Sequence, residues 1–343
     1  MSILIAIVMF GVLIFVHELG HFLACRIFGV KVNEFAVGMG PLLFSRKGKK
    51  SGTTYSLRLL PIGGYNSIEG ENGDSTAEDA FCTKPVWQRM IIIVSGALMN
   101  LLFAGLLMCI LVGATERLGT TVIHSFSPDE GAVSTENYGL QVGDRILKIN
   151  GKRVHTVDDM LYTVAFEATK PVPVLVERNG EEELVEGVVF PTYESAGVLF
   201  GTVDFSVLRA EKNLGTILRH SLFKCTGSME MIWESLAGLV TGKFGLEQVS
   251  GPVGVTGALG DAARSGLLNV LNMVVLISLN LGIFNLLPIP ALDGGRLVFL
   301  GIEAIRRKPI KYEIENMIHT VGITVLMLIM VVVTFKDIIF LFK

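Results

Sequence analysis

The chain has 343 residues, of which half are hydrophobic and only 18% are charged, and its mean hydropathy is +0.57. This composition is too apolar for an ordinary soluble domain and indicates a membrane protein in contact with the lipid bilayer. The 29 basic residues are nearly balanced by 32 acidic residues. Because no overall positive field exists to hold a nucleic acid, DNA and RNA partners are not expected.

Four segments are long and apolar enough to span a bilayer, which requires about 20 such residues. They comprise residues 2–27, 90–114, 267–292 and 317–342. The first has neither the basic start nor the small-residue cleavage site of a signal peptide, so we interpret it as a helix. The sequence therefore predicts a polytopic α-helical membrane protein with four transmembrane segments.

The first span contains the run His17-Glu18-Leu19-Gly20-His21. On a helix, residues four apart lie on one face, so both imidazoles can bind one zinc ion with Glu18 beside it. His and Glu are costly in an apolar helix unless they are paired or bind a metal. The run therefore predicts a metal site rather than an accidental polar cluster.

Residues 33–62, which follow the first span, contain two β-like runs around a basic glycine turn. They predict a membrane-associated β-hairpin on the cytoplasmic side. It could be a plain cap, but Gly38 and Gly40 would let a second backbone approach closely. We favour a hairpin whose edge pairs with substrate.

Residues 121–195, after the second span, have the pattern of a small α/β domain. Alternating apolar strands are separated by turn signals such as Asn150-Gly151 and Asn179-Gly180, and a helix is predicted over residues 157–167.

The string GLQVGDRILKING within this domain resembles the core of a PDZ domain. Such domains bind peptides by strand addition. A peptide binder, a rigid domain without a ligand and a filter that excludes large substrates all remain open. Asp129 and Glu130, just before the string, would repel a peptide carboxylate and favour the filter.

Residues 214–239 show apolar residues at helical spacing with charges between them, which predicts an amphipathic helix at the membrane surface. The third span follows and ends in Asn285-Leu-Leu-Pro-Ile-Pro-Ala-Leu-Asp293-Gly-Gly. A catalytic zinc usually has three protein ligands, and Asp293 is the acid at the end of this span. Pro288 would break the helix and the two glycines would allow a turn, so Asp293 could reach the first span; a simple helix cap is the alternative.

Basic residues indicate the orientation in the membrane. The loop 26–89 has nine Lys and Arg, and five more follow Asp293, so both loops should be cytoplasmic. Residues 116–212 have nine basic and sixteen acidic residues, as expected for an exported domain. Both termini and the PDZ-like domain are then extracytoplasmic, and the metal site lies near the cytoplasmic side.

Taken together, these motifs resemble the bacterial site-2 proteases of the regulator-of-sigma-E type, a family of intramembrane zinc metalloproteases. The H-E-L-G-H run, the Gly38-Met39-Gly40 turn, the motif at residues 95–100, the PDZ-like insert and the L-D-G run occur in the family's order along essentially the whole chain.

The resemblance implies specific roles for residues of this chain. His17, His21 and Asp293 would bind zinc and Glu18 would be the catalytic acid and base. Residues placed near the substrate backbone are Asn285, Pro288, Gly38, Met39 and Gly40. The implied substrates are single-pass membrane proteins, such as anti-sigma factors after a first extracytoplasmic cut, or signal-peptide remnants. We expect a monomer in the bacterial cytoplasmic membrane.

Two departures from the family pattern stand out. Some relatives have two PDZ domains, whereas this chain has room for one. The family's G-P-x-x-N motif reads Gly96-Ala97-Leu98-Met99-Asn100 here, without the proline, which puts a kink at that point in doubt.

Two other classes of protein are alternatives to a protease. A metal transporter can place His and Asp in a membrane, but it rarely needs a Glu beside the metal or a PDZ-like domain. A catalytically silent scaffold would use only the PDZ-like domain. The predicted organisation has eight parts, with boundaries at 1–28, 29–89, 90–115, 121–195, 196–266, 267–293, 294–316 and 317–342.

Overall fold

A computed structural model of the chain describes residues 2–49, 51–71, 73, 75–115, 118–127, 134–195, 198–242 and 249–341. Asp129 and Glu130 lie outside these residues. The chain forms two compact units. The first, here called the membrane unit, contains Met1–Leu107 and Met229–Lys343, and the second, the inserted unit, contains Met108–Ser228.

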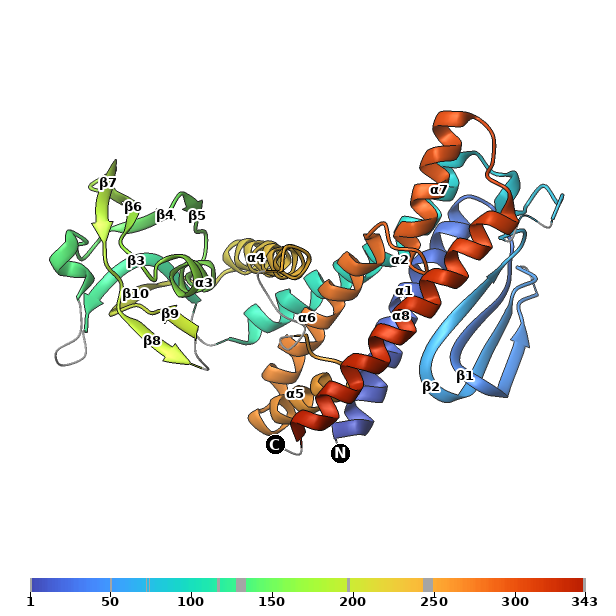
Figure 1. Cartoon of the computed structure of the whole chain (residues 1–343), viewed down its shortest axis with the longest axis horizontal. Helices are drawn as coiled ribbons and strands as arrows, with labels where there is room; N and C mark the ends of the chain where they lie inside the picture. Colours follow the sequence, from blue (N-terminus) through green and yellow to red (C-terminus); the bar gives the residue numbers. More distant parts are fainter. Residues whose placement is uncertain are drawn as a thin grey trace. The chain divides into compact units, whose positions relative to one another are not determined.

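Four helices among the described residues are long and apolar enough to cross a membrane (Figure 1). They are α1 (Ser2–Ile27), α2 (Val86–Ala114), α6 (Leu267–Leu286) and α8 (Tyr312–Leu341). The four predicted spans are thus helical, and the chain has the architecture of a membrane protein. Helix α2 is continuous through Ala97, where the family's proline is missing.

Helix α6 ends at Leu286, six residues before the predicted end of the third span. Pro288 and Pro290 follow directly, and proline lacks the N–H that a helix interior requires. A new helix, α7 (Asp293–Arg306), then begins at Asp293 and occupies most of the segment predicted as a loop. Its 14 residues are too few for a span, which is why a search for long apolar runs misses it.

A second short helix, α5 (Pro252–Ser265), lies in the segment predicted as a linker. It contacts α1, α6 and α8. Figure 1 shows α1 beginning and α8 ending at the same end of the membrane unit, beside α5. Asp337 of α8 accepts hydrogen bonds from the backbone N–H groups of Gly251 and Gly254, which joins these two helices.

The sheet beside α1 consists of β1 (Val32–Lys47) and β2 (Thr54–Ile68), each of which reverses direction midway. The pairing register resolves them into four segments in the order 64–68, 32–37, 54–58 and 42–47, in which the two outer pairs are antiparallel and the central pair, 32–37 with 54–58, is parallel. The reversal in β1 lies at Gly38 and Gly40, both of which have positive φ angles of 83° and 81°. The predicted hairpin is therefore a small sheet, and residues 64–68 form the edge segment adjoining α1.

The inserted unit contains one main antiparallel sheet in the order β10-β3-β4-β6-β7, with β5 paired to β4. Its strands are β3 (Leu118–Phe126), β4 (Arg145–Ile149), β5 (Lys152–Arg153), β6 (Val172–Arg178), β7 (Glu181–Val188) and β10 (Phe205–Ala210). A separate hairpin is formed by β8 (Thr192–Ser195) and β9 (Val198–Gly201). Helix α4 (Leu214–Val240) follows, close to the predicted amphipathic helix.

The folded region extends beyond the predicted boundary at residue 195. Strand β10 pairs with β3, and Phe205 belongs to the apolar core with Ile123 and Val174. The buried carboxylate of Asp204 accepts hydrogen bonds from the backbone N–H and the hydroxyl of Thr135. The sequence pattern misses this strand because it is separated from the others by the β8–β9 hairpin.

Local signals in this domain are confirmed. Helix α3 spans Val157–Glu167 as predicted, with a capping box between Thr156 and Asp159. Asn150 and Asn179 have positive φ angles, as tight hairpin turns require. The buried carboxylate of Asp144 in the GLQVGD string accepts hydrogen bonds from Nε and Nη2 of Arg178, each at 2.8 Å, which tie this loop to the end of β6.

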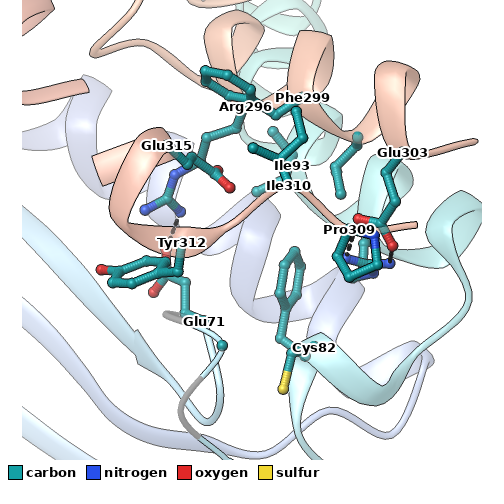
Figure 2. Close-up of a pocket in the computed structure, with 14 residues that line it drawn as sticks. Glu71, Cys82, Ile93, Arg296, Phe299, Glu303, Pro309, Ile310, Tyr312 and Glu315 are labelled. Atoms are coloured by element: carbon teal, nitrogen blue, oxygen red, sulfur yellow. Dashed lines mark hydrogen bonds and ion pairs between the residues drawn. The ribbon is translucent and has the colours of Figure 1, made fainter. Parts of the chain in front are cut away.

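A pocket of about 320 Å³ opens in the membrane unit between α7, α8 and the loop after β2 (Figure 2). Four of its five charged side chains form ion pairs, Arg296 with Glu71 and Arg89 with Glu303, and the fifth is Glu315. The remaining lining is largely apolar. Arg296 lies one helical turn after Asp293, so the pocket adjoins the start of α7.

Candidate active site

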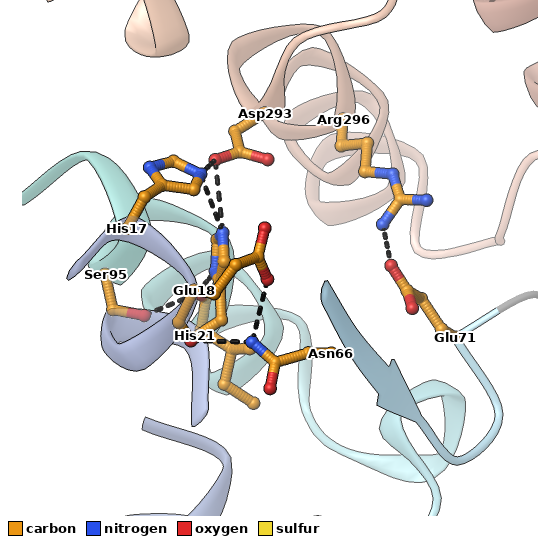
Figure 3. Close-up of polar contacts among 9 residues, drawn as sticks. His17, Glu18, His21, Asn66, Glu71, Ser95, Asp293 and Arg296 are labelled. Atoms are coloured by element: carbon orange, nitrogen blue, oxygen red, sulfur yellow. Dashed lines mark hydrogen bonds and ion pairs between the residues drawn. The ribbon is translucent and has the colours of Figure 1, made fainter. Parts of the chain in front are cut away.

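Three side chains from two distant segments converge in the membrane unit (Figure 3). His17 and His21 come from α1, and Asp293 is the first residue of α7. Asp293 Oδ2 lies 3.1 Å from His17 Nε2 and 3.3 Å from His21 Nε2, and the two Nε2 atoms are 3.2 Å apart. The predicted contact between the H-E-x-x-H helix and the L-D-G motif is therefore present.

The three atoms fit a zinc ion. Tetrahedral zinc with bonds of about 2.0–2.2 Å places neighbouring ligand atoms about 3.3 Å apart. Asp293 Oδ2 is buried and has no hydrogen-bond partner among the described residues, although both nitrogens are close. Lone pairs of three buried polar atoms that face one another are unfavourable unless a cation lies between them. Each of the three residues offers one ligand atom to such an ion.

A backbone carbonyl of α2 fixes the orientation of the His21 ring. Its Nδ1 donates to the backbone carbonyl of Ile92 in α2 at 2.8 Å, so the lone pair of Nε2 points into the cluster. Gly96 lies one turn further along α2, and a Cβ there would be 2.3 Å from His21 Nε2 and 2.8 Å from His17 Cε1. Only glycine therefore leaves room for both imidazoles.

Glu18 lies beside the cluster and is held by Asn66, a residue that no sequence motif marks. The side-chain amide of Asn66 donates to Glu18 Oε2 at 2.9 Å and to the Glu18 backbone carbonyl at 2.6 Å (Figure 3). Asn66 lies on the edge segment of the sheet. A lone Asn in a β-like run has no sequence signal, because only the folded chain shows which helix its strand adjoins.

The sharp turn predicted at Gly294 and Gly295 lies instead in the loop before Asp293. The residue with a positive φ angle is instead Ala291, at 88°. The two glycines are helical and serve close packing: a Cβ at Gly294 would be 2.0 Å from the carbonyl oxygen of Leu287, and one at Gly295 would be 2.6 Å from that of Ile289. Their predicted role in the turn is therefore wrong, but the close packing still requires glycine at both positions.

The residues predicted to contact substrate fall into two groups. Met39, in the Gly38–Gly40 turn, is exposed and packs beside Gly63. Gly63 also lies close to Ile14 of α1, which is one helical turn before His17. Asn285 is half-buried near the end of α6, and Pro288 is exposed in the loop leading to Asp293. Both groups thus adjoin elements that carry the cluster.

This constellation defines a class of protein. Two histidines and one carboxylate around a zinc-sized gap, with a glutamate adjoining them, form the centre of a zinc metalloprotease. That centre lies on a helix apolar enough to span a bilayer.

Comparison with known proteins agrees. The model of Peptidase family M50 matches residues 5–329. A zinc metalloprotease RasP from Geobacillus kaustophilus is 32% identical, covering 98% of this chain and 97% of that protein. The regulator of sigma-W protease RasP from Bacillus subtilis is 30% identical, covering 97% of each. A predicted zinc metalloprotease from Clostridium acetobutylicum is 36% identical, covering 99% of this chain and 98% of that protein.

The chain therefore belongs to Peptidase family M50, the site-2 proteases, and is a zinc metalloprotease. The expected enzyme class and cofactor are confirmed. The alignment with the Geobacillus protein runs over 419 residues, which is longer than this chain, so that relative has residues without a counterpart here.

Proposed function

We propose that this enzyme hydrolyses peptide bonds within the transmembrane segments of single-pass membrane proteins. The observation that carries this proposal is the cluster of His17, His21 and Asp293, which lies on the spanning helix α1 and the start of α7. A protease centre on a spanning helix acts on chains that enter the bilayer. Transport of metal is less well supported, because a transporter rarely needs a glutamate beside the metal, and here Glu18 is held beside the cluster by the amide of Asn66.

The three converging side chains are the proposed zinc ligands. When bound, zinc polarises the scissile carbonyl and makes water acidic enough to ionise near neutral pH. Glu18 accepts the proton of the attacking water and delivers it to the leaving amine. Asn66 holds the Glu18 carboxylate through one N–H and the helix backbone through the other, so the base keeps one orientation.

The substrate must be extended before it can be cut, because a helix hides each carbonyl in its hydrogen-bond ladder. Residues 64–68 form a sheet edge whose Asn66 contacts Glu18. An unwound substrate paired along this edge would lie beside the catalytic residue. We propose that the Gly38–Met39–Gly40 turn, Asn285 and Pro288 hold the same stretch of backbone.

The proposed substrates are anti-sigma factors after a first extracytoplasmic cut, and signal-peptide remnants. One relative is named a regulator of sigma-W protease, which supports a regulatory role. We propose that the enzyme acts as a monomer, because all three ligands come from one chain.

The test uses the purified full-length enzyme in liposomes with a panel of synthetic spanning peptides. We expect cuts within the apolar segment, mapped by mass spectrometry, that stop when a chelator removes zinc and resume when zinc is restored. A soluble peptide of matched length without an apolar segment is the control. Equal cleavage of that control, or cleavage that persists after zinc removal, would contradict the proposal.

We also propose an orientation in which both termini and the inserted unit, with its PDZ-like strands, are extracytoplasmic. The support is the excess of acidic residues in that unit and the basic loops on the other side. Lys49 and Glu181 are both exposed, so each can be replaced by cysteine in a cysteine-free background. In intact cells an impermeant thiol reagent should label the Glu181→Cys variant and not the Lys49→Cys variant. The reverse pattern would invert the topology.

A further inference from the structure

Helix α8 supplies none of the proposed zinc ligands, yet it contacts the loop that delivers Asp293. His319 lies in this helix with its side chain 14% exposed. Its Nδ1 accepts a hydrogen bond from the backbone N–H of Ala291 at 3.0 Å. Ala291 is two residues before Asp293, so this bond fixes the backbone immediately ahead of the ligand.

The backbone at this point needs support from outside. Ala291 has a φ angle of 88°, which residues with a Cβ seldom adopt. Its loop runs between Leu287 and Leu292 without helical structure. A conformation of this kind persists only where surrounding groups hold it, and it is typical of functional sites.

A second residue of α8 contacts the same loop. Gly322 is three residues after His319 and therefore lies on the same face of the helix. A Cβ at Gly322 would be 2.4 Å from Pro290 Cβ and 2.7 Å from its carbonyl carbon and oxygen. The loop thus rests directly on the α8 backbone, and glycine is needed for that approach.

His319 also reaches the helix that Asp293 begins. Its ring lies 5.6 Å from the ring of Phe299 in α7, measured between centroids. The imidazole therefore contacts the chain on both sides of Asp293, two residues before it and six residues after it.

We propose that His319 is a positioning residue of the zinc site, acting with Gly322 to hold the residue 287–292 loop so that Asp293 meets His17 and His21. This inference rests on the proposed assignment of Asp293 as a zinc ligand. In this proposal, helix α8 supports the loop that carries Asp293, the third zinc ligand.

The test measures zinc affinity of the full-length protein in detergent by competition with a chromogenic chelator, without any substrate. His319→Leu keeps the bulk and removes the acceptor, while His319→Asn keeps an acceptor near the position of Nδ1. We expect the leucine variant to bind zinc about tenfold more weakly, the lower end of what loss of a ligand's support costs, and the asparagine variant to stay close to the parent.

Gly322→Ala tests the same contact without changing a polar group, and it should also weaken zinc binding. Its matched control is Gly301→Ala in α7, where a Cβ meets no atom within 4 Å. Asp293→Asn serves as the reference for the ligand itself. All variants are compared only as monodisperse protein.

The outcomes distinguish the positioning role of His319 from the assignment of Asp293 as a zinc ligand. Weaker binding in His319→Leu and Gly322→Ala, with parental binding in His319→Asn and Gly301→Ala, supports the positioning role. If Asp293→Asn weakens zinc binding but both α8 variants bind like the parent, the positioning role is wrong and the ligand assignment stands. If Asp293→Asn itself binds zinc like the parent, the proposed site fails and this inference fails with it.

Discussion

Replacing Glu18 by glutamine should abolish most hydrolysis while the protein still folds and binds zinc. The amide has nearly the shape of the carboxylate but cannot take a proton from water. A positioned general acid and base contributes about 10²- to 10⁴-fold to a rate, so kcat for a spanning peptide should fall by that factor. Zinc content should stay at the parental value, because none of the three converging ligand atoms belongs to Glu18.

The matched control is Glu182→Gln in the inserted unit, where the side chain is exposed on β7. It makes the same chemical change at a position distant in sequence from the zinc ligands. The kcat of this variant should stay within about twofold of the parental value, as is usual for a substitution at an exposed position. If Glu18→Gln kept more than a tenth of the parental kcat, the proton would have to be transferred by another group.

The ligand set could be predicted from sequence because its parts are strong local signals. The spacing of His17 and His21 defines one helix face, and a histidine pair in an apolar run has few structural explanations. Asp293 follows two prolines at the end of an apolar segment, so a break that could redirect the chain was visible. In the folded chain all three side chains lie within contact distance of one another.

The supports of the site could not be predicted because they depend on tertiary contacts. Asn66 and His319 are ordinary residues in a strand and a helix, and their importance comes from the Glu18 carboxylate and the Ala291 N–H that they meet. The reversal of β1 at Gly38 was visible as a glycine, but the pairing of residues 32–37 with two other segments was not. Short amphipathic helices such as α5 and α7 fall below the length that identifies a span.

Removing one histidine ligand should remove zinc. In His17→Ala two of the three ligands remain, and the Asp293 carboxylate loses its nearest partner at 3.1 Å. Loss of a group that merely supports a ligand costs about 10- to 100-fold in metal affinity, and loss of the ligand itself should exceed this. The zinc content measured by elemental analysis should fall from one ion per chain to a small fraction of that after dialysis against a weak chelator. The rate of hydrolysis should fall with it.

The control for this substitution is His124→Ala, because His124 is an exposed histidine in the inserted unit. Gly96→Ala provides a companion that leaves every ligand in place. Its added methyl group would lie 2.3 Å from His21 Nε2, so the imidazoles must shift and zinc should again be lost. Gly105→Ala in the same helix meets no atom within 4 Å and should bind zinc like the parent. Full zinc content in His17→Ala would remove His17 from the ligand set. Full zinc content in Gly96→Ala would show that the imidazoles can move away from the added methyl group and still bind zinc, so that glycine is not required at this position.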